Sequence, residues 1–226
     1  MCHVGKDHFK GCIFDLDGVI VDSAGFHYQS WKRLASELGF DFTEEQNEGM
    51  KGISRMASLD IVLEIGNITA TKEEKASMAD QKNEWYREQL VNLTETAILP
   101  GVLDFLKTLK EANIPFALGS ASKNAGLVMS KIGISNMFHT IVDGNDTIKS
   151  KPDPEVFYKG AEALNIDPSS IVVFEDSYKG LDAANTGGFI SCGVGSAENL
   201  SNADFVIDGF EGFTIEELER RIGLIY

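Results

Sequence analysis

The sequence predicts an α/β protein with a doubly wound, Rossmann-like parallel sheet as its core and a helical cap inserted into it. Three observations lead to this prediction. A short apolar run at residues 11–15 comes first, a long helical stretch follows over residues 25–93, and short apolar runs then alternate with helical segments. Strands alternating with helices build parallel sheets with right-handed crossovers. With 226 residues, 43% of them hydrophobic, the chain can bury one large core beside a smaller module.

The stretch between residues 25 and 93 reads as four helices, because apolar residues recur at a spacing near 3.6 without β-branched runs. These helices are predicted over residues 29–38, 44–50, 54–65 and 71–93. Thr71 and Glu74 form a capping box at the start of the last helix. A Leu-Pro-Gly break at residues 99–101 returns the chain to the core. We therefore predict a cap over residues 23–93 and a core made of residues 1–22 and 94–226.

The remainder of the chain supplies the other strands and helices of the core. Strands are predicted over residues 114–118, 140–142, 171–174, 189–194 and 205–207, and helices over residues 101–112, 123–132, 154–165, 177–186 and 214–222. Cap and core are joined at two places only, where Gly18, Gly25 and Gly101 are candidate hinges. The sequence thus predicts a cap that closes over the core.

The charge of the chain restricts its partners. A formal net charge of −15 and a pI near 4.6 give a surface that repels nucleic acid and anionic membranes. The three cysteines, Cys2, Cys12 and Cys192, match neither a metal site nor a disulfide framework, which favours a reducing compartment. No apolar run is long enough to span a bilayer. We expect a cytoplasmic monomer that binds neither nucleic acid nor membrane.

Two carboxylates come directly after the first predicted strand. Asp15 and Asp17 are two residues apart, and Gly18 follows them. On an extended chain this spacing places both side chains on the same side, and the glycine lets the backbone turn sharply. One carboxylate can then act as a nucleophile while the other handles protons, with both near a cation. The segment therefore indicates phosphoryl transfer.

Further polar side chains follow other predicted strands or precede a helix. They are Ser120, Ser122, Lys123 and Asn124, then Lys151, then Glu175 and Asp176. Ligands of open α/β sheets bind outside the carboxyl ends of the strands, so we expect these residues to converge with Asp15 and Asp17. At an effective dielectric of about 20, each pair of carboxylates near 4 Å costs roughly 4 kcal/mol. We therefore expect Mg²⁺ in the crevice, with Lys151 adding a fixed positive charge.

Four segments in this order resemble the motifs of the haloacid dehalogenase-like phosphotransferase superfamily. They are residues 14–18 (FDLDG), 119–122 (GSAS), 151–152 (KP) and 175–177 (EDS), and together they cover nearly the whole chain. The resemblance implies that Asp15 is the nucleophile that becomes an aspartyl-phosphate and that Asp17 is the general acid and base. It implies that Ser120 and Lys151 hold the transferring phosphoryl group. Mg²⁺ is then bound by Glu175, Asp176, Asp15 and the backbone carbonyl of Asp17.

The predicted cap is similar to that of the β-phosphoglucomutase subfamily. The similar segments are residues 22–27 with Trp31, residues 51–55 (KGISR), residues 82–83 and residues 122–124 (SKN). The resemblance implies that the sugar phosphate group not being transferred is held by Gly52, Ile53 and Arg55 together with Ser122, Lys123 and Asn124. It also implies that His27 and Lys82 couple substrate binding to cap closure. His27 and Trp31, four residues apart on a helix, can alternatively be explained as packing within the cap.

These observations lead to three functional hypotheses. The first is a mutase that interconverts β-D-glucose 1-phosphate and glucose 6-phosphate through phosphorylated Asp15 and a bisphosphate intermediate. The second is a phosphatase of small sugar phosphates on the same scaffold, in which water attacks the phosphorylated Asp15. The third is a metal-binding interaction module without catalytic activity. The second phosphate site around Arg55 separates the first two hypotheses, because only the mutase requires it.

Overall fold

The computed structural model describes residues 9–225 and contains one six-stranded sheet in the order β3-β2-β1-β4-β5-β6. The strands are β1 (Gly11–Phe14), β2 (Phe116–Gly119), β3 (Thr140–Val142), β4 (Ile171–Glu175), β5 (Ile190–Val194) and β6 (Phe205–Ile207). All neighbouring pairs run parallel. The order reverses at β1, which places a crevice between the loops after β1 and β4. The doubly wound α/β fold predicted from the sequence is thus confirmed.

Helices cover both faces of this sheet. They are α5 (Val102–Glu111), α6 (Ala125–Lys131), α7 (Glu155–Leu164), α8 (Tyr178–Thr186) and α9 (Ile215–Ile222). Successive strand residues point to opposite faces. Phe14 therefore joins a cluster with α5, α6 and α9, where its ring stacks on Phe174 at 4.8 Å between centroids. Ile13, one residue earlier, packs with Phe157 in a second cluster on the face covered by α7 and α8.

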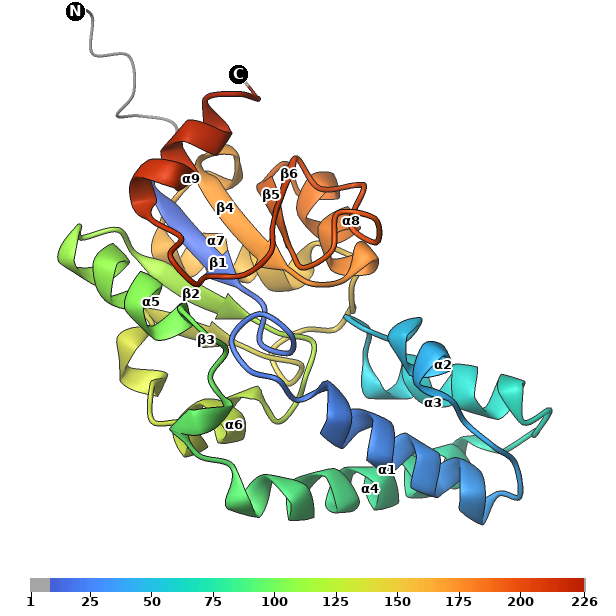
Figure 1. The fold of residues 1–226 in the computed structure, drawn as a ribbon. Coiled ribbons are helices and arrows are strands. Elements are labelled where there is room, and N and C mark those ends of the chain that lie inside the picture. Colours follow the sequence, from blue (N-terminus) through green and yellow to red (C-terminus); the bar gives the residue numbers. More distant parts are fainter. Residues whose placement is uncertain (1–8, 226) are drawn as a thin grey trace, which may run out of the picture.

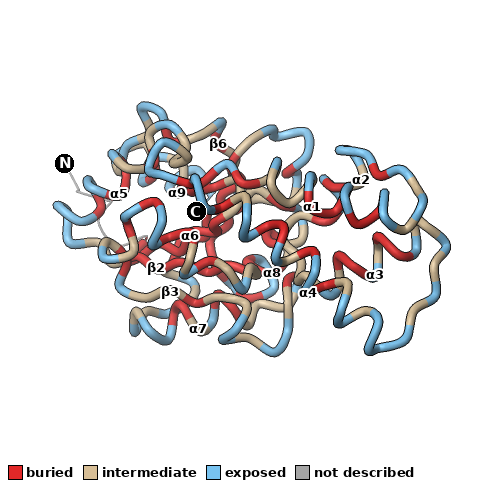
Figure 2. Tube along the Cα trace, turned by 90° about the horizontal axis from the view of Figure 1, so that it is seen from below, coloured by how far each residue is buried: buried red, intermediate tan, exposed pale blue. Residues whose placement is uncertain are grey.

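The helical region lies beyond the carboxyl end of β1 and has a hydrophobic cluster of its own (Figure 1). It contains α1 (Ala24–Glu37), α2 (Glu44–Glu48), α3 (Arg55–Ile65) and α4 (Lys72–Gln89). Figure 2 shows that buried positions recur along these helices. Many of their apolar residues, Trp31, Leu59 and Trp85 among them, pack together in that cluster. Tyr86, near the end of α4, instead packs into the cluster of the sheet. The boundaries of a cap at residues 23 and 93 remain a prediction.

Most boundaries agree with the predicted ones to within two residues, and the larger differences concern α1 and α4. Helix α1 starts at Ala24 rather than at residue 29, because the backbone N–H groups of Phe26 and His27 already bond to the carbonyl of Ser23. The candidate hinge Gly25 consequently lies inside the first turn of α1. Helix α4 ends at Gln89 and continues as a short 3₁₀ turn, and α6 starts two residues later than predicted.

Several smaller predictions can also be compared with the structure. The capping box of α4 is present, since Thr71 and Glu74 exchange hydrogen bonds between side chain and backbone. Cys12 and Cys192 are free and buried, while Cys2 lies outside the described residues. None of the helices within residues 9–225 combines the length and the apolar character needed to cross a membrane.

Candidate active site

The predicted site residues come together in a single cavity of about 460 Å³ between the sheet and the helical region. All of them line this cavity except Lys151 and Glu175, which are buried beneath it. Its walls are formed by the loops after β1, β2 and β4 on one side and by α1, α3 and α4 on the other. These residues, which are spread over about 160 positions of the sequence, thus converge outside the carboxyl ends of the parallel strands, where this sheet topology places a binding site.

Lys151 lies at the centre of a buried ionic cluster. Its Nζ atom is 2.6 Å from Asp15 Oδ1 and 2.6 Å from Glu175 Oε1, and the side chains of Lys151 and Glu175 are fully shielded from solvent. The other carboxylate oxygen of Glu175 accepts hydrogen bonds from the backbone N–H and the hydroxyl of Ser177. Removing one partner from a buried arrangement of this kind leaves an uncompensated charge. The cluster therefore fixes the position of Asp15.

The carboxylates of the cavity carry more negative charge than Lys151 can balance. Burial raises the pKa of Asp15 well above its ordinary value, and the charges of Glu175, Asp17 and Asp176 raise it further, while Lys151 opposes the rise. Burial opposes the charge of Lys151 as well, but Asp15 and Glu175 outweigh it and raise the pKa of that ammonium. Burial and Glu175 raise the pKa of Asp176 to about 7. The site therefore favours additional positive charge.

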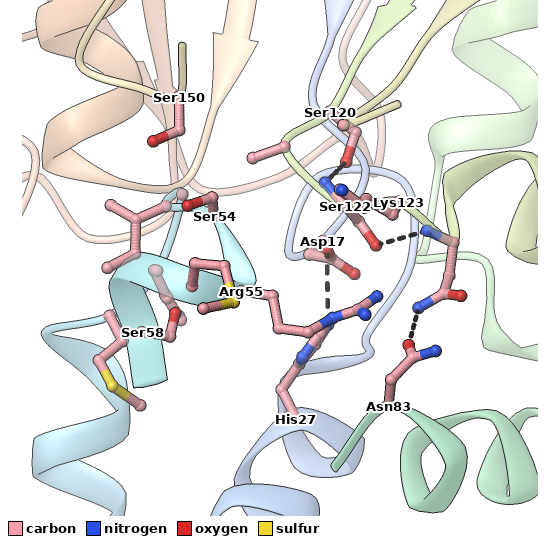
Figure 3. A pocket seen from close by; sticks show the side chains of 18 of the residues that line it. Asp17, His27, Ser54, Arg55, Ser58, Asn83, Ser120, Ser122, Lys123 and Ser150 are labelled. Carbon is pink, nitrogen blue, oxygen red and sulfur yellow. Dashed lines mark hydrogen bonds and ion pairs between the residues drawn. The ribbon is translucent and has the colours of Figure 1, made fainter. Parts of the chain in front are cut away.

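Asp17 is held by groups from the start of the helical region. The hydroxyl of Ser23 donates a hydrogen bond to Asp17 Oδ1, and His27 Nε2 lies 3.9 Å from Asp17 Oδ2 (Figure 3). Burial raises the pKa of Asp17, and the Ser23 hydrogen bond opposes this. A raised pKa favours the protonated form of this carboxyl, which is the direction that a group able to donate and accept a proton needs.

His27 is half-buried beside positive charges, and its tautomer depends on the protonation of Lys82. Burial lowers its pKa well below the ordinary value, and the charges of Lys82 and Arg55 lower it further, so its contact with Asp17 is not an ion pair. Lys82 Nζ lies 2.9 Å from His27 Nδ1. While Lys82 carries its proton it can only donate, so Nδ1 accepts and the proton of the imidazole is on Nε2, which faces Asp17. The ring of His27 also stacks on Tyr86, with centroids 4.2 Å apart.

Lys82 is almost fully buried, as is Lys151, and the other lysines of residues 9–225 are more exposed. Its ammonium lies 4.5 Å from the ring centroid of Trp31 and 5.1 Å from that of Tyr86. Burial and the charge of Arg55 lower its pKa to about 7, and Asp17 opposes this. Trp31 belongs to the hydrophobic cluster of the helical region, so packing accounts for its burial even though it also lines the cavity.

Arg55 and Lys123 contrast with the buried cluster. No hydrogen bond or ion pair of either side chain is recorded within residues 9–225. Arg55 reaches from the first turn of α3 across the cavity toward the loop that carries Ser122 (Figure 3). The Arg55 side chain is half-buried, which lowers the pKa of its guanidinium, but the group remains charged. After the role predicted for them from the sequence, we call Arg55, Ser122, Lys123 and Asn124 the second phosphate subsite.

Gly18 and Gly52 bring backbone close to the carboxylates. Gly18 has φ +80°, and a Cβ there would collide with the carboxylate of Asp176. Gly52 has φ +75°, and a Cβ there would collide with the hydroxyl of Ser177 at the start of α8. Both positions thus require glycine for its left-handed conformation and its small size. The loop containing Gly52 and Ile53 consequently lies directly against the loop after β4.

The carboxylates of the cavity differ in how well they suit the expected Mg²⁺, which prefers oxygen ligands. Asp15 and Asp176 fit it, because both are carboxylates largely shielded from solvent, whose pKa is raised by burial and then by the negative charges of Glu175 and Asp17. Glu175 differs, since both its oxygens are hydrogen-bonded within the protein. Within the described part of the chain, no three His, Cys, Asp or Glu side chains are arranged to hold a metal ion. Ligation of Mg²⁺ by Asp15, Glu175, Asp176 and the Asp17 carbonyl therefore stays a prediction, and among these groups Asp15, Asp176 and the Asp17 carbonyl are the ones we carry forward as a proposal.

Four residues of the site were not predicted from the sequence: Ser23, Lys51, Asn83 and Ser177. Ser23 and Ser177 orient Asp17 and Glu175. Lys51 Nζ lies 3.3 Å from Asp176 Oδ2 and 2.9 Å from Glu48 Oε2, so it joins the helical region to the sheet. All four lie within segments that carry the family resemblance, at residues 22–27, 51–55, 82–83 and 175–177, and that place in the motifs is the signal that could have indicated them.

Comparison with known proteins gives consistent matches over most of the chain. The model of the haloacid dehalogenase-like hydrolase family matches residues 12–194. The β-phosphoglucomutase of Bacillus subtilis is 36% identical over 92% of this chain and 93% of its own length. A phosphorylated carbohydrates phosphatase of Thermotoga maritima is 29% identical over 79% of this chain and 82% of its own. The crystal structure of a β-phosphoglucomutase from Clostridium difficile superposes with a TM-score of 0.92 at 41% identity, covering 96% of this chain and 98% of that one.

Proposed function

The chain belongs to the haloacid dehalogenase-like hydrolase family, and from this premise we propose that it is a hexose-phosphate mutase. The reaction is the interconversion of β-D-glucose 1-phosphate and glucose 6-phosphate through phosphorylated Asp15 and glucose 1,6-bisphosphate. The similarity to β-phosphoglucomutases of Bacillus subtilis and Clostridium difficile supports this substrate. The observation that carries the proposal is a second set of cationic side chains, Arg55 and Lys123, in the same cavity as Asp15.

Asp15 is the nucleophile of the proposed mechanism. A carboxylate oxygen of Asp15 attacks phosphorus, the bond from phosphorus to the donor oxygen breaks, and Asp15 then carries the phosphoryl group. Lys151, 2.6 Å from Asp15, offsets negative charge that builds on the phosphoryl oxygens, and Ser120 donates a hydrogen bond to one of them. Mg²⁺, when bound at Asp15, Asp176 and the Asp17 carbonyl, neutralises further charge on these oxygens.

Asp17 moves the proton in both halves of the reaction. In the first half it accepts the proton of the 6-hydroxyl as that oxygen attacks the phosphoryl group on Asp15, which forms the bisphosphate. The bisphosphate then reorients. In the second half Asp15 attacks the 1-phosphate, and Asp17 returns its proton to the departing O1. Ser23 and the neutral His27, its Nε2–H toward Asp17, keep the carboxyl of Asp17 in place between the two halves.

Arg55 and Lys123 hold the phosphate that is not being transferred. A guanidinium binds phosphate oxygens through two parallel hydrogen bonds, and an ammonium supplies a compact charge. Because the two phosphates are held at separate places, the bisphosphate can bind with either its 1-phosphate or its 6-phosphate at Asp15. The mutase reaction requires both of these orientations. A phosphatase needs only the subsite at Asp15. The cavity, about 460 Å³, has the volume for a small phosphorylated sugar.

The test is a coupled assay of the purified protein with β-D-glucose 1-phosphate, Mg²⁺ and a trace of glucose 1,6-bisphosphate. Glucose 6-phosphate and free inorganic phosphate are measured in the same samples. The proposal predicts that glucose 6-phosphate forms far faster than phosphate is released. Release of phosphate without formation of glucose 6-phosphate would contradict the mutase and favour a phosphatase such as the one from Thermotoga maritima.

A further inference from the structure

An amide–amide hydrogen bond joins the helical region to the loop after β2 inside the cavity. Asn83 lies on α4, and Asn124 directly precedes α6. The Nδ2 atom of Asn124 donates to Oδ1 of Asn83 at 2.9 Å (Figure 3). Both side chains are half-buried and line the cavity. Asn83 therefore contacts the second phosphate subsite from the opposite wall.

The backbone leading to Asn124 is already held by two serine hydroxyls. The N–H of Ser122 donates to Ser120 Oγ at 3.1 Å, and the N–H of Asn124 donates to Ser122 Oγ at 3.2 Å. Each hydroxyl acts as acceptor in these bonds and keeps its own proton for a ligand oxygen. These two bonds restrain the backbone but not the Asn124 amide, which can still rotate about its last side-chain bond.

The direction of that amide decides whether Asn124 attracts or repels an anion. One side of the group is an NH₂ donor, and the other is a carbonyl oxygen that carries partial negative charge. Because Asn83 Oδ1 is an acceptor, it holds the NH₂ side of Asn124 and leaves one N–H of that group to donate to a ligand. Without this acceptor the amide can turn and present its oxygen to the phosphate.

We propose that Asn83 is a positioning residue for the second phosphate subsite, acting by holding the Asn124 amide with its donor side toward the bound phosphate. The inference rests on the proposed function, because the phosphate concerned is the non-transferring one of a hexose phosphate. It also links the subsite to the arrangement of the two regions. Asn124 is set correctly only while α4 lies against the loop after β2, so phosphate binding and docking of the helical region stabilise each other.

A double-mutant cycle tests this role. The variants are Asn83→Leu, Asn124→Leu and the pair together, and leucine replaces the amide by an apolar group of similar volume. A hydrogen bond to a charged group is worth roughly 1.5–3 kcal/mol, so each single variant should raise KM for β-D-glucose 1-phosphate by about tenfold to hundredfold. If Asn83 acts through Asn124, the double variant should show the same KM as the Asn124→Leu variant rather than the product of the two effects.

Two controls separate positioning from general damage. Gln81→Leu is the matched control, since Gln81 lies on the same helix and its amide donates to Glu37, outside the cavity, at 3.2 Å. It should leave KM unchanged. Hydrolysis of p-nitrophenyl phosphate, which has one phosphate and no need of the second subsite, should stay within about twofold in Asn83→Leu and in Gln81→Leu, as expected for sites that act independently.

Three outcomes would overturn the inference: an unchanged KM in Asn83→Leu, effects that multiply in the double variant, or an equal loss of p-nitrophenyl phosphate hydrolysis. A failure of the proposed function would look different. The unmodified protein would then release phosphate from glucose 1-phosphate without forming glucose 6-phosphate. In that case the same cycle, measured as KM for phosphate release, would still decide the role of Asn83.

Discussion

The carboxylate–lysine cluster around Asp15 and the second phosphate subsite line the same cavity but are built in opposite ways. Lys151 is fully buried and contacts two carboxylates at 2.6 Å, whereas Arg55 and Lys123 carry positive charge with no partner recorded among the described residues. The first set is assembled before any ligand arrives. The second leaves its charge to be neutralised by an anion. The contrast indicates a chemical step at the cluster and reversible phosphate binding at the subsite.

The largest expected effect concerns the nucleophile. Asp15→Asn should lower both mutase turnover and hydrolysis of p-nitrophenyl phosphate by about 10⁴-fold or more, because an amide cannot form the covalent intermediate. Radiolabelled phosphate from the substrate should also no longer remain on the denatured protein. Asp104→Asn, an exposed carboxylate on α5, is the matched control and should retain full activity. Substantial turnover in Asp15→Asn would place the chemistry elsewhere.

The next effect concerns stability. Lys151→Met leaves Asp15 and Glu175 as buried like charges, so the free energy of unfolding at pH 7 should fall by about 3–5 kcal/mol in denaturant titrations. The raised pKa of Asp15 gives the sign of the pH dependence. Protonation favours the folded state of such a group, so the deficit should shrink as the pH falls below the raised pKa. A deficit that grew in acid would contradict this account of the cluster.

Lys131→Met provides the comparison for that experiment. Lys131, at the end of α6, is exposed and its ammonium contacts only the carbonyl of Val91, at 3.4 Å. Its replacement should change the free energy of unfolding by less than about 0.5 kcal/mol. The contrast between the two lysines measures how much of the effect comes from burial of the ion pairs.

A smaller effect is expected in the pH profile. Burial and Arg55 lower the pKa of Lys82 to about 7, and its ammonium donates to His27. If the ammonium form is the active one, kcat/KM for p-nitrophenyl phosphate should fall about tenfold per pH unit above this pKa. Arg55→Ala removes a positive neighbour, so the falling limb should move to higher pH. A limb that stayed in place would show that Lys82 does not control it.

The buried cluster could be predicted from the sequence to a much greater extent than its surroundings. Asp15, Ser120 and Glu175 directly follow or end apolar strands, and parallel topology brings such positions to one edge. Lys151 follows no strand, and it was found from its place before a helix and from the family resemblance. The local signals were sufficient because the sheet itself determines where these residues lie.

The contacts between the helical region and the sheet were not predictable in the same way. Ser23 with Asp17, Lys51 with Asp176 and Asn83 with Asn124 depend on how two separately packed regions meet, and no periodic pattern in the sequence encodes this. The early start of α1 has a similar origin. Its first turn is held by the Ser23 carbonyl while the Ser23 side chain is used by Asp17.

The central claim is that the cavity holds two phosphates by two separable sets of groups. The most direct measurement compares β-D-glucose 1-phosphate conversion with p-nitrophenyl phosphate hydrolysis in Arg55→Ala, with Arg87→Ala on the exposed side of α4 as the control. The account predicts at least about a hundredfold loss of conversion, from lost charge-assisted hydrogen bonds, with hydrolysis of the small ester within about twofold of the unmodified protein. An equal loss of both activities would contradict it, because Arg55 would then belong to the same functional unit as Asp15.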